Sequence, residues 1–317
     1  MFTIRAASSE VVYHRGDLVE VHNLEEILGT LDGDGKLDGI LFMPEMARSC
    51  GCRFRVCRRA EKICVEGAGL RRLGGAVFLD GLRCDGAMHD GCQRGCLYLW
   101  KEAWLKPVVS DASIPPALED PESRSAGLDS NRNVLAAALP TTKGDRYYCQ
   151  STELLTATSE FPRWNLRHYL RDLRDGEVSL PRLVRILWRV GTNKIRRLLG
   201  LGQLGLVLGR QVNPPKGDLN LQAGEWVEVK SRAEILTTLD ATGHNRGLSF
   251  ETEMFDHCGR RYQVAYPVCR IILEETGKMV ELASTVILDG VTCRGLCVKN
   301  CPRNNFFYWR ESWLRRV

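Results

Sequence analysis

The spacing of apolar side chains predicts short strands and one short helix in the first hundred residues. Val19 and Val21 alternate with charged residues, which is the period-two pattern of a half-buried strand. Residues 25–31 place three apolar side chains on one face of a short helix. Residues 53–56 and 76–79 alternate or cluster apolar residues in the manner of two further strands. The predicted order is strand, short helix, strand, strand and a final helix.

The same pattern returns near the C-terminus. Residues 26–32 match residues 234–240 at an offset of 208, and residues 100–105 match residues 309–314 at an offset of 209. Self-similarity at a fixed offset is the signature of a duplicated unit. We therefore interpret residues 12–107 and 222–317 as two homologous modules, and we expect them to superpose and to pack against each other.

Each module is expected to have an α+β fold built on a small β-barrel. Residues 16–21, Gly-Asp-Leu-Val-Glu-Val, resemble the opening strand of a KOW or Src-homology type barrel, a resemblance that implies no function. Cys92, Cys96, Trp100 and Trp104 follow one another at intervals of four residues, which places them on one side of a helix. We therefore expect a C-terminal helix over residues 92–105 to close the module.

The region between the modules divides into two parts. Residues 108–160 form a linker, rich in Pro, Ser, Asp and Ala over 111–133, that ends in a segment with Cys149. Residues 161–221 are predicted to be a basic helical insert, because leucines recur at helical spacing after Trp164 and again after Ser179. Together with the Tyr-Tyr-Cys-Gln-Ser-Thr-Glu run at 147–153, this organisation resembles a bacterial family of tandem-repeat, cysteine-rich proteins that is itself uncharacterised. The resemblance implies no activity.

Positive charge is concentrated in the insert. The chain of 317 residues has 44 Lys and Arg against 39 Asp and Glu, a formal net charge of +5. Residues 163–216 hold twelve basic and three acidic residues, so the rest of the chain sums to about −4. A local basic surface of this kind favours a polyanion, either nucleic acid or an anionic membrane surface, or an acidic protein. The arginines expected to contact it are Arg182, Arg185, Arg189, Arg196 and Arg197.

Thirteen cysteines are the main chemical feature of the sequence. The N-terminus lacks the apolar run of a signal peptide and no stretch is long enough to span a bilayer, so we expect a cytoplasmic protein. Clustered thiols in a reducing compartment indicate metal or redox chemistry more often than disulfides. Cysteines can also be small buried core residues, which is our interpretation of Cys50, Cys52 and Cys57.

One cluster has the spacing of a metal site. Cys84, His89, Cys92 and Cys96 form a C-x4-H-x2-C-x3-C set, which suits a tetrahedral zinc site. An iron–sulfur cluster would instead recruit a further sulfur and leave the histidine free. Cys64 and Cys149 are candidates for that sulfur, and Cys293, Cys297 and Cys301 form a second, non-identical cluster.

Two classes of function fit these features. The chain contains no phosphate-binding loop, nucleophile elbow, His-Glu-x-x-His pair or dinucleotide fingerprint, so the familiar hydrolase and nucleotide-cofactor classes are disfavoured. The first class is a metal-binding scaffold, with zinc or an iron–sulfur cluster, that holds an acidic partner. The second is an iron–sulfur or dithiol redox enzyme with its site between the modules. The sequence leaves open whether the protein is an enzyme.

Overall fold

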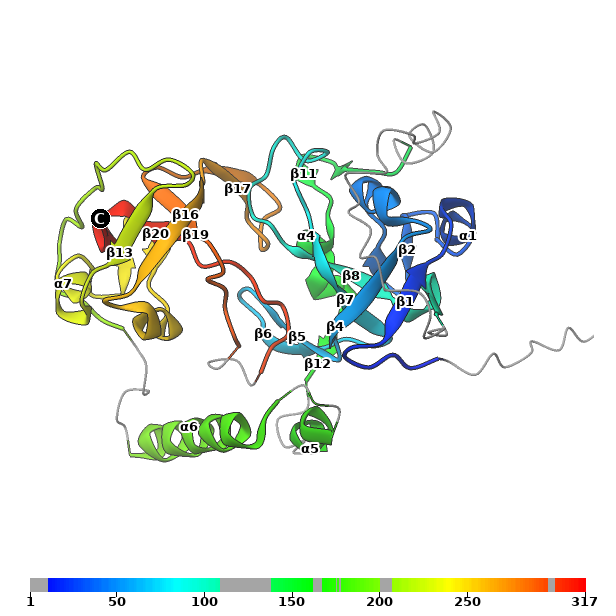
Figure 1. Cartoon of the computed structure of the whole chain (residues 1–317), viewed down its shortest axis with the longest axis horizontal. Helices are drawn as coiled ribbons and strands as arrows, with labels where there is room; N and C mark the ends of the chain where they lie inside the picture. The colour runs from blue at the N-terminus through cyan, green and yellow to red at the C-terminus, as the bar shows by residue number, and fades with distance from the viewer. Residues whose placement is uncertain are drawn as a thin grey trace, which may run out of the picture.

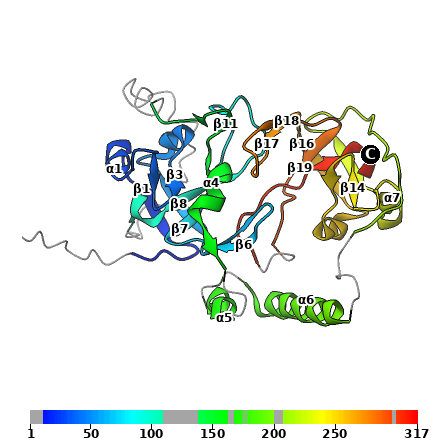
Figure 2. The same ribbon diagram turned by 180° about the vertical axis from the view of Figure 1, so that it is seen from behind.

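Antiparallel strands form most of the regular structure of this mixed α+β protein. The structure is a computed structural model that describes residues 11–108, 138–161, 167–174, 176, 178–199, 207–295 and 300–317. Two five-stranded sheets lie at opposite ends of the molecule, and two helices of the insert lie along one side (Figures 1 and 2). The predicted α+β class and the predominance of short strands are confirmed.

The first sheet is a curved half-barrel whose strand order is β8-β7-β4-β1-β9. The last two strands in sequence, β8 and β9, form its opposite edges and are joined by a single 3-10 turn, η2. The sheet strands are β1 (Leu18–Val21), β4 (Arg53–Arg59), β7 (Ala76–Arg83), β8 (Leu97–Lys101) and β9 (Leu105–Pro107), with η2 at Glu102–Trp104. Around it lie α1 (Leu24–Leu28), β2 (Lys36–Leu37), β3 (Ile40–Leu41), η1 (Pro44–Ser49), β5 (Lys62–Val65) and β6 (Gly69–Arg72).

The second sheet has the corresponding order, β20-β19-β16-β13-β21. Its strands are β13 (Trp226–Val229), β16 (Arg261–Pro267), β19 (Thr285–Leu288), β20 (Trp309–Arg310) and β21 (Leu314–Arg316). Around it lie α7 (Arg232–Leu236), β14 (His244–Asn245), β15 (Leu248–Ser249), η4 (Thr252–His257), β17 (Arg270–Ile272), β18 (Met279–Glu281) and η5 (Glu311–Trp313). We call two residues matching when they are related by the offset of 208 or 209. Strands that contain matching residues therefore hold the same place in the two sheets.

The two cores also contain matching aromatic groups. Phe42 makes edge contacts with Trp100 and Trp104 at centroid distances of 6.3 and 5.4 Å. The matching Phe250 contacts Trp309 and Trp313 at 6.2 and 5.0 Å. All four tryptophans are fully buried, and burial of such large side chains is a major stabilising contribution to each half.

The predicted C-terminal helix of each half is wrong. Residues 97–101 form strand β8 and residues 102–104 a 3-10 turn, so the tryptophans are brought together by a strand followed by a turn. In the second half, β20 and η5 do the same. Tertiary pairing explains the difference, because β7 provides ladder partners for β8 from Leu97 to Lys101. In addition, Gly95 adopts a positive φ angle of 61°, which a helix cannot include.

The segment before the insert is part of the first half. It contains β10 (Thr142–Lys143), β11 (Arg146–Tyr147), α4 (Gln150–Ala157) and β12 (Ser159–Glu160). Strand β12 extends the β5–β6 hairpin, and α4 lies against β3. The stretch expected to be a linker, 111–133, lies outside the described residues. The insert contains the predicted helices as α5 (Arg167–Arg174) and α6 (Leu180–Leu198).

The halves contact each other through matching residues. The N–H of Ile272 in β17 donates to Cys92 Sγ at 3.3 Å, and the N–H of Cys64 in β5 donates to Cys301 Sγ at 3.1 Å. Ile272 matches Cys64, and Cys301 matches Cys92. Each half therefore gives the other the same contact, which is the pattern of a twofold-symmetric interface.

Charged groups at the centre of this interface also make matching contacts. Arg94 donates to the carbonyl oxygen of Ile272 at 3.0 Å, and the matching Arg303 donates to that of Cys64 at 2.8 Å. Glu274 accepts from Arg303 at 2.7 Å and lies 3.4 Å from Arg94, which also pairs with Glu66. We call Glu66, Arg94, Ser151, Glu274 and Arg303 the central ion network.

Candidate functional site

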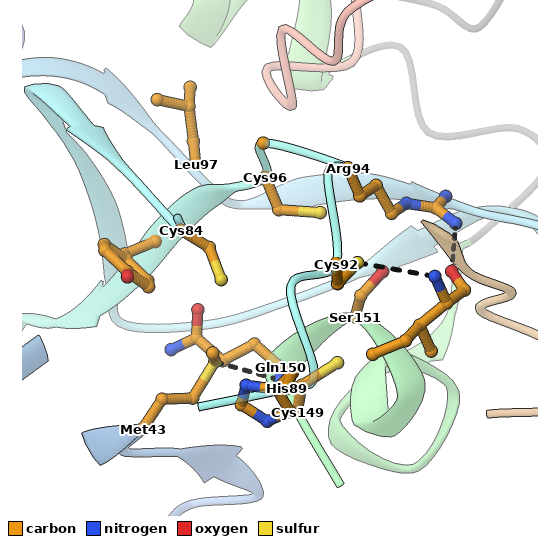
Figure 3. Close-up of a pocket in the computed structure, with 13 residues that line it drawn as sticks. Met43, Cys84, His89, Cys92, Arg94, Cys96, Leu97, Cys149, Gln150 and Ser151 are labelled. Atoms are coloured by element: carbon orange, nitrogen blue, oxygen red, sulfur yellow. Dashed lines mark hydrogen bonds between the residues drawn. The ribbon is translucent and has the colours of Figure 1, made fainter. Parts of the chain in front are cut away.

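Four cysteines line one small cavity beside the first sheet. The cavity has a volume of about 30 Å³, and its wall includes Cys84, Cys92, Cys96 and Cys149 together with Met43 (Figure 3). Cys84 follows β7, Cys92 and Cys96 lie in the loop before β8, and Cys149 is the N-cap of α4. A space of this size holds about one or two water molecules or a single ion. We call this site the cysteine cavity.

Glycines give the loop between β7 and β8 its shape. Gly86 has a φ angle of 70°, in the left-handed region that favours glycine. A Cβ at this position would lie 2.0 Å from the carbonyl oxygen of Cys92, so the two backbone segments are in direct contact. The N–H of Cys84 donates to the carbonyl oxygen of Cys96 at 2.8 Å and closes the loop at its base. These contacts turn the loop back on itself and bring its cysteines to one place.

Burial keeps most of these sulfurs protonated. It raises the pKa of Cys84 and of Cys92, and it raises the pKa of Cys149 to about 11. The twelve described cysteines are all free thiols. Neutral thiols of Cys84, Cys92 and Cys149 therefore line much of the cavity. A bound cation reverses this preference, because a thiol that coordinates a metal loses its proton.

His89 sits beside the cavity with both ring nitrogens facing oxygen atoms. Nδ1 lies 2.8 Å from a carboxylate oxygen of Glu45, and Nε2 lies 3.1 Å from the carbonyl oxygen of Tyr148. The carbonyl can only accept, so Nε2 carries a hydrogen. Burial disfavours the charged ring, but the hydrogen bond and charge of Glu45 outweigh it and raise the pKa of His89 above its ordinary value of 6.5. The pair is a buried histidine–carboxylate contact at the edge of the cavity.

This contact predicts a pH dependence of stability. Because the folded-state pKa of His89 is raised, its contribution is fully present below pH 6.5 and is lost as the pH rises through the folded value. We expect the contribution to be about 1–3 kcal/mol, the range for hydrogen bonds to charged groups. Urea unfolding of the wild type and of His89→Gln at a series of pH values measures it. The difference in stability between the two proteins should shrink toward alkaline pH, and a constant difference would contradict the assignment.

The structure places the described metal-ligand candidates around two cavities, because Cys64 lines the same larger cavity as Cys293 and Cys301. Cys84, Cys92, Cys96 and Cys149 line the cysteine cavity, with His89 at its edge. Cys64 lies at the interface of the halves, next to Cys301. In the parts of the chain that the structure describes, no group of three or more His, Cys, Asp or Glu side chains is arranged so that it could hold a metal ion. Metal binding by any of these residues stays a prediction.

The second predicted cluster is only partly described. Cys293 and Cys301 line a larger cavity in the second half, of about 350 Å³. Burial raises the pKa of Cys293, so its thiol is protonated like those of the first half. Cys297 lies outside the described residues.

No family model, curated protein or solved structure matches this chain. Its function is therefore argued from the geometry of its own residues. No helix among the described residues is long and apolar enough to cross a membrane.

Sequence reasoning missed the partners that complete the cysteine cavity. Gln150 and Ser151 reach it from α4, and Arg94 reaches it from the same loop as Cys92. Both arginines of the central ion network had a signal in the sequence, because Arg94 and Arg303 are matching residues. Gln150 had none, because its role depends on where α4 docks.

Four of the six basic residues of α6 occupy one side of that helix. Arg182, Arg185, Arg189 and Arg196 are spaced by three, four and seven residues, which keeps them in one stripe. Arg185 is exposed, and Arg182 is half-buried and donates to the carbonyl oxygen of Arg294. The side chain of Arg197 lies outside the described part of the structure. Of the leucines at helical spacing in the insert, Leu183 is buried with Tyr169 and Ile186 and Leu173 packs against them, whereas Leu170 and Leu187 are exposed.

Proposed function

We propose that this protein is a cysteine-ligated metal-binding protein that takes zinc or an iron–sulfur cluster at the cysteine cavity. The observation that carries the proposal is the lining of one ion-sized cavity by Cys84, Cys92, Cys96 and Cys149. Thiolates are the ligands that zinc and iron–sulfur clusters share. Four cysteines supply a complete tetrahedral set, so His89 can keep both of its oxygen partners.

Metal binding at this site is coupled to movement of the loop. The sulfurs must be drawn closer together than they are in the described structure, and the thiols must lose their protons. The loop of residues 84–96 contains Gly86, Gly91 and Gly95, and it carries three of the four sulfurs. Bound metal would therefore fix this loop against α4.

We further propose that the chain is a scaffold made from two copies of one small Src-homology type barrel. Equal strand order in the two sheets supports this proposal, as do the matching aromatic groups and the reciprocal contacts of Cys92 and Cys301. The stripe of arginines on α6 supports an acidic partner, because a row of positive charges on one helix face attracts a negatively charged surface.

Metal analysis of cysteine variants tests the proposal. We expect the full-length protein, reduced and incubated with Zn²⁺ or with Fe²⁺ and sulfide, to retain metal after desalting. Cys84→Ser and Cys92→Ser should each lower the metal content several-fold, because each removes one ligand of a shared ion. Zinc at about a hundredfold excess over its Kd should also stabilise the wild type by about 2.7 kcal/mol. Elemental analysis, absorption spectroscopy and thermal unfolding measure these effects.

Cys269→Ser is the matched control, since Cys269 is exposed and does not line the cysteine cavity. Its metal content should equal that of the wild type. Full metal content in both Cys84→Ser and Cys92→Ser would overturn the assignment.

A specific contact favours dithiol redox chemistry as the second candidate. Cys64 and Cys301 meet between the halves, where the N–H of Cys64 donates to Cys301 Sγ at 3.1 Å. Burial and the neighbouring Cys301 raise the pKa of Cys64 to about 12, so a redox role needs an activating change at this thiol. A metal-free protein that forms a reversible Cys64–Cys301 disulfide would favour this function over the metal site.

A further inference from the structure

The chain fills a groove of its first half with its own helix α4. The amide of Gln150 donates to the carbonyl oxygens of Leu41 and Leu99, both at 2.8 Å, and its oxygen accepts from the N–H of Leu99 at 2.8 Å. Gln150 thus pairs with the edge of β8 as a further strand would. Its own N–H donates to the sulfur of Met43 at 3.4 Å. Two small spaces remain between α4 and the sheet, the cysteine cavity of about 30 Å³ and a cavity of about 20 Å³ lined by Gln150, Leu154 and Leu99.

The second half has a matching groove, in which the described part of the chain places no helix. Its cavity of about 350 Å³ is lined by residues that match the wall of the cysteine cavity. Cys293 matches Cys84, Cys301 matches Cys92 and Arg303 matches Arg94, and Cys64 takes the place of Ile272. Among the described elements, no helix lies against β15 as α4 lies against β3. We call this cavity the second groove.

The positions that hold α4 in the first half line the second groove. Ser249 matches Leu41 and Tyr308 matches Leu99, so the backbone that would receive an amide side chain is in the matching place. Leu248, Ile271 and Phe306 supply apolar walls. A cavity of this size is within the range of about 300–1,000 Å³ in which ligands are buried.

One difference in residue type between the two grooves indicates which end of a helical segment the second groove favours. Met43, whose sulfur accepts the N–H of Gln150, is replaced by Glu251, an exposed residue that lines the groove. A carboxylate accepts from backbone N–H groups at a helix N-terminus more strongly than a thioether does, and it complements the positive end of the helix dipole. Glu253, at the position of Glu45, adds a second carboxylate to the wall.

We propose that the second groove binds a short helical segment of a partner protein, entering N-terminus first, with an amide side chain in its first turn. The segment would occupy the second groove as α4 occupies the first. Its amide would pair with the backbone of Tyr308 and Ser249, and its first N–H groups would face Glu251. This site is separate from the proposed metal site, and its occupation requires no metal.

A peptide with the sequence of residues 146–157, with Ser at the position of Cys149 and a fluorescent label at its C-terminus, is the probe. We expect saturable binding to the full-length protein by fluorescence anisotropy. A peptide with Ala in place of Gln150 should bind at least tenfold more weakly, because it lacks the amide. Glu251→Met should weaken binding several-fold. Chelators should have no effect, which separates this result from failure of the metal proposal.

Two protein variants locate the binding. Ser249→Trp fills the second groove from an exposed position and should abolish binding, whereas Ala241→Trp, exposed on the neighbouring turn, should not change it. Absence of binding, or equal binding by Ser249→Trp, would overturn the proposal. A wild-type dimer that loses its self-association in Ser249→Trp would also overturn it, because the occupant would then be a second copy of this chain.

Discussion

Replacing Glu274 by glutamine is expected to destabilise the protein by about 3–5 kcal/mol, the cost of removing one partner from a buried ion pair. The carboxylate is buried and accepts from Arg303 at 2.7 Å, from Ser151 at 3.0 Å and from the N–H of Glu66 at 2.9 Å. Glutamine keeps the shape but leaves the buried charges of Arg303 and Arg94 without their shared counter-charge. Because this group joins the two halves, we expect them to separate before either sheet unfolds.

Urea unfolding followed by tryptophan fluorescence measures the effect. Glu275→Gln is the matched control, since Glu275 is the exposed neighbour and should change stability by less than about 0.5 kcal/mol. A wild-type midpoint in Glu274→Gln would mean that the central ion network contributes nothing to stability.

Glu274 also makes the stability of the folded protein depend on pH in the acid range. Burial acts to raise the pKa of Glu274, but the charges and hydrogen bonds of Arg303 and Arg94 outweigh it and hold this pKa below its ordinary value of 4.5. Its contribution is therefore fully present above pH 4.5 and is lost as the pH falls through the folded value. Glu274→Gln should lack this part of the acid dependence.

Gly86→Ala is expected to have the second largest effect, at least about 3 kcal/mol. Its φ of 70° strains any residue with a Cβ, and here the Cβ would lie 2.0 Å from the carbonyl oxygen and 2.7 Å from the nitrogen of Cys92. The backbone must therefore move, and the loop that carries the cysteines would open. We expect the thiols of Cys84 and Cys92 to react with a thiol reagent that does not reach them in the wild type.

Gly91→Ala is the control that separates the cost of backbone strain from the cost of the steric contact with Cys92. Gly91 has the same φ of 70°, but a Cβ there would meet nothing within 4 Å. Its cost should be the backbone strain alone, about 1–2 kcal/mol. Equal losses in the two variants, measured by urea unfolding, would show that the contact between Gly86 and Cys92 does not matter.

The reciprocal contacts between the halves connect the effects expected at Glu274 and at Gly86. Gly295 matches Gly86, and its Cβ would lie 2.5 Å from the carbonyl oxygen of Cys301. Each loop turns back on itself in the same way and presents one sulfur to the other half. The shape of the cysteine loops and the joining of the halves thus depend on the same residues.

The sequence by itself determined the local pattern of this protein. Period-two alternation identified β1 at Val19 and Val21, because a strand exposes alternate side chains whatever surrounds it. Helical spacing and charge identified α6 in the same way. The fixed offset also related Trp100 and Trp104 to Trp309 and Trp313 before their contacts were known. Local spacing marked Cys84, Cys92 and Cys96 as a group.

Only the tertiary structure decided how residues 92–105 fold. Their spacing of four residues is compatible with a helix, but β7 offers a row of backbone partners that a helix could not use, and Gly95 at positive φ interrupts the turn. The place where α4 docks was likewise decided only by the tertiary structure. Nothing local in Gln150 shows that its amide pairs with Leu41 and Leu99, because these partners are more than fifty residues away in sequence. Docking of α4 fills one groove, and among the described elements no helix fills the matching groove, so the two similar halves differ by a segment that follows the repeated part of the first half.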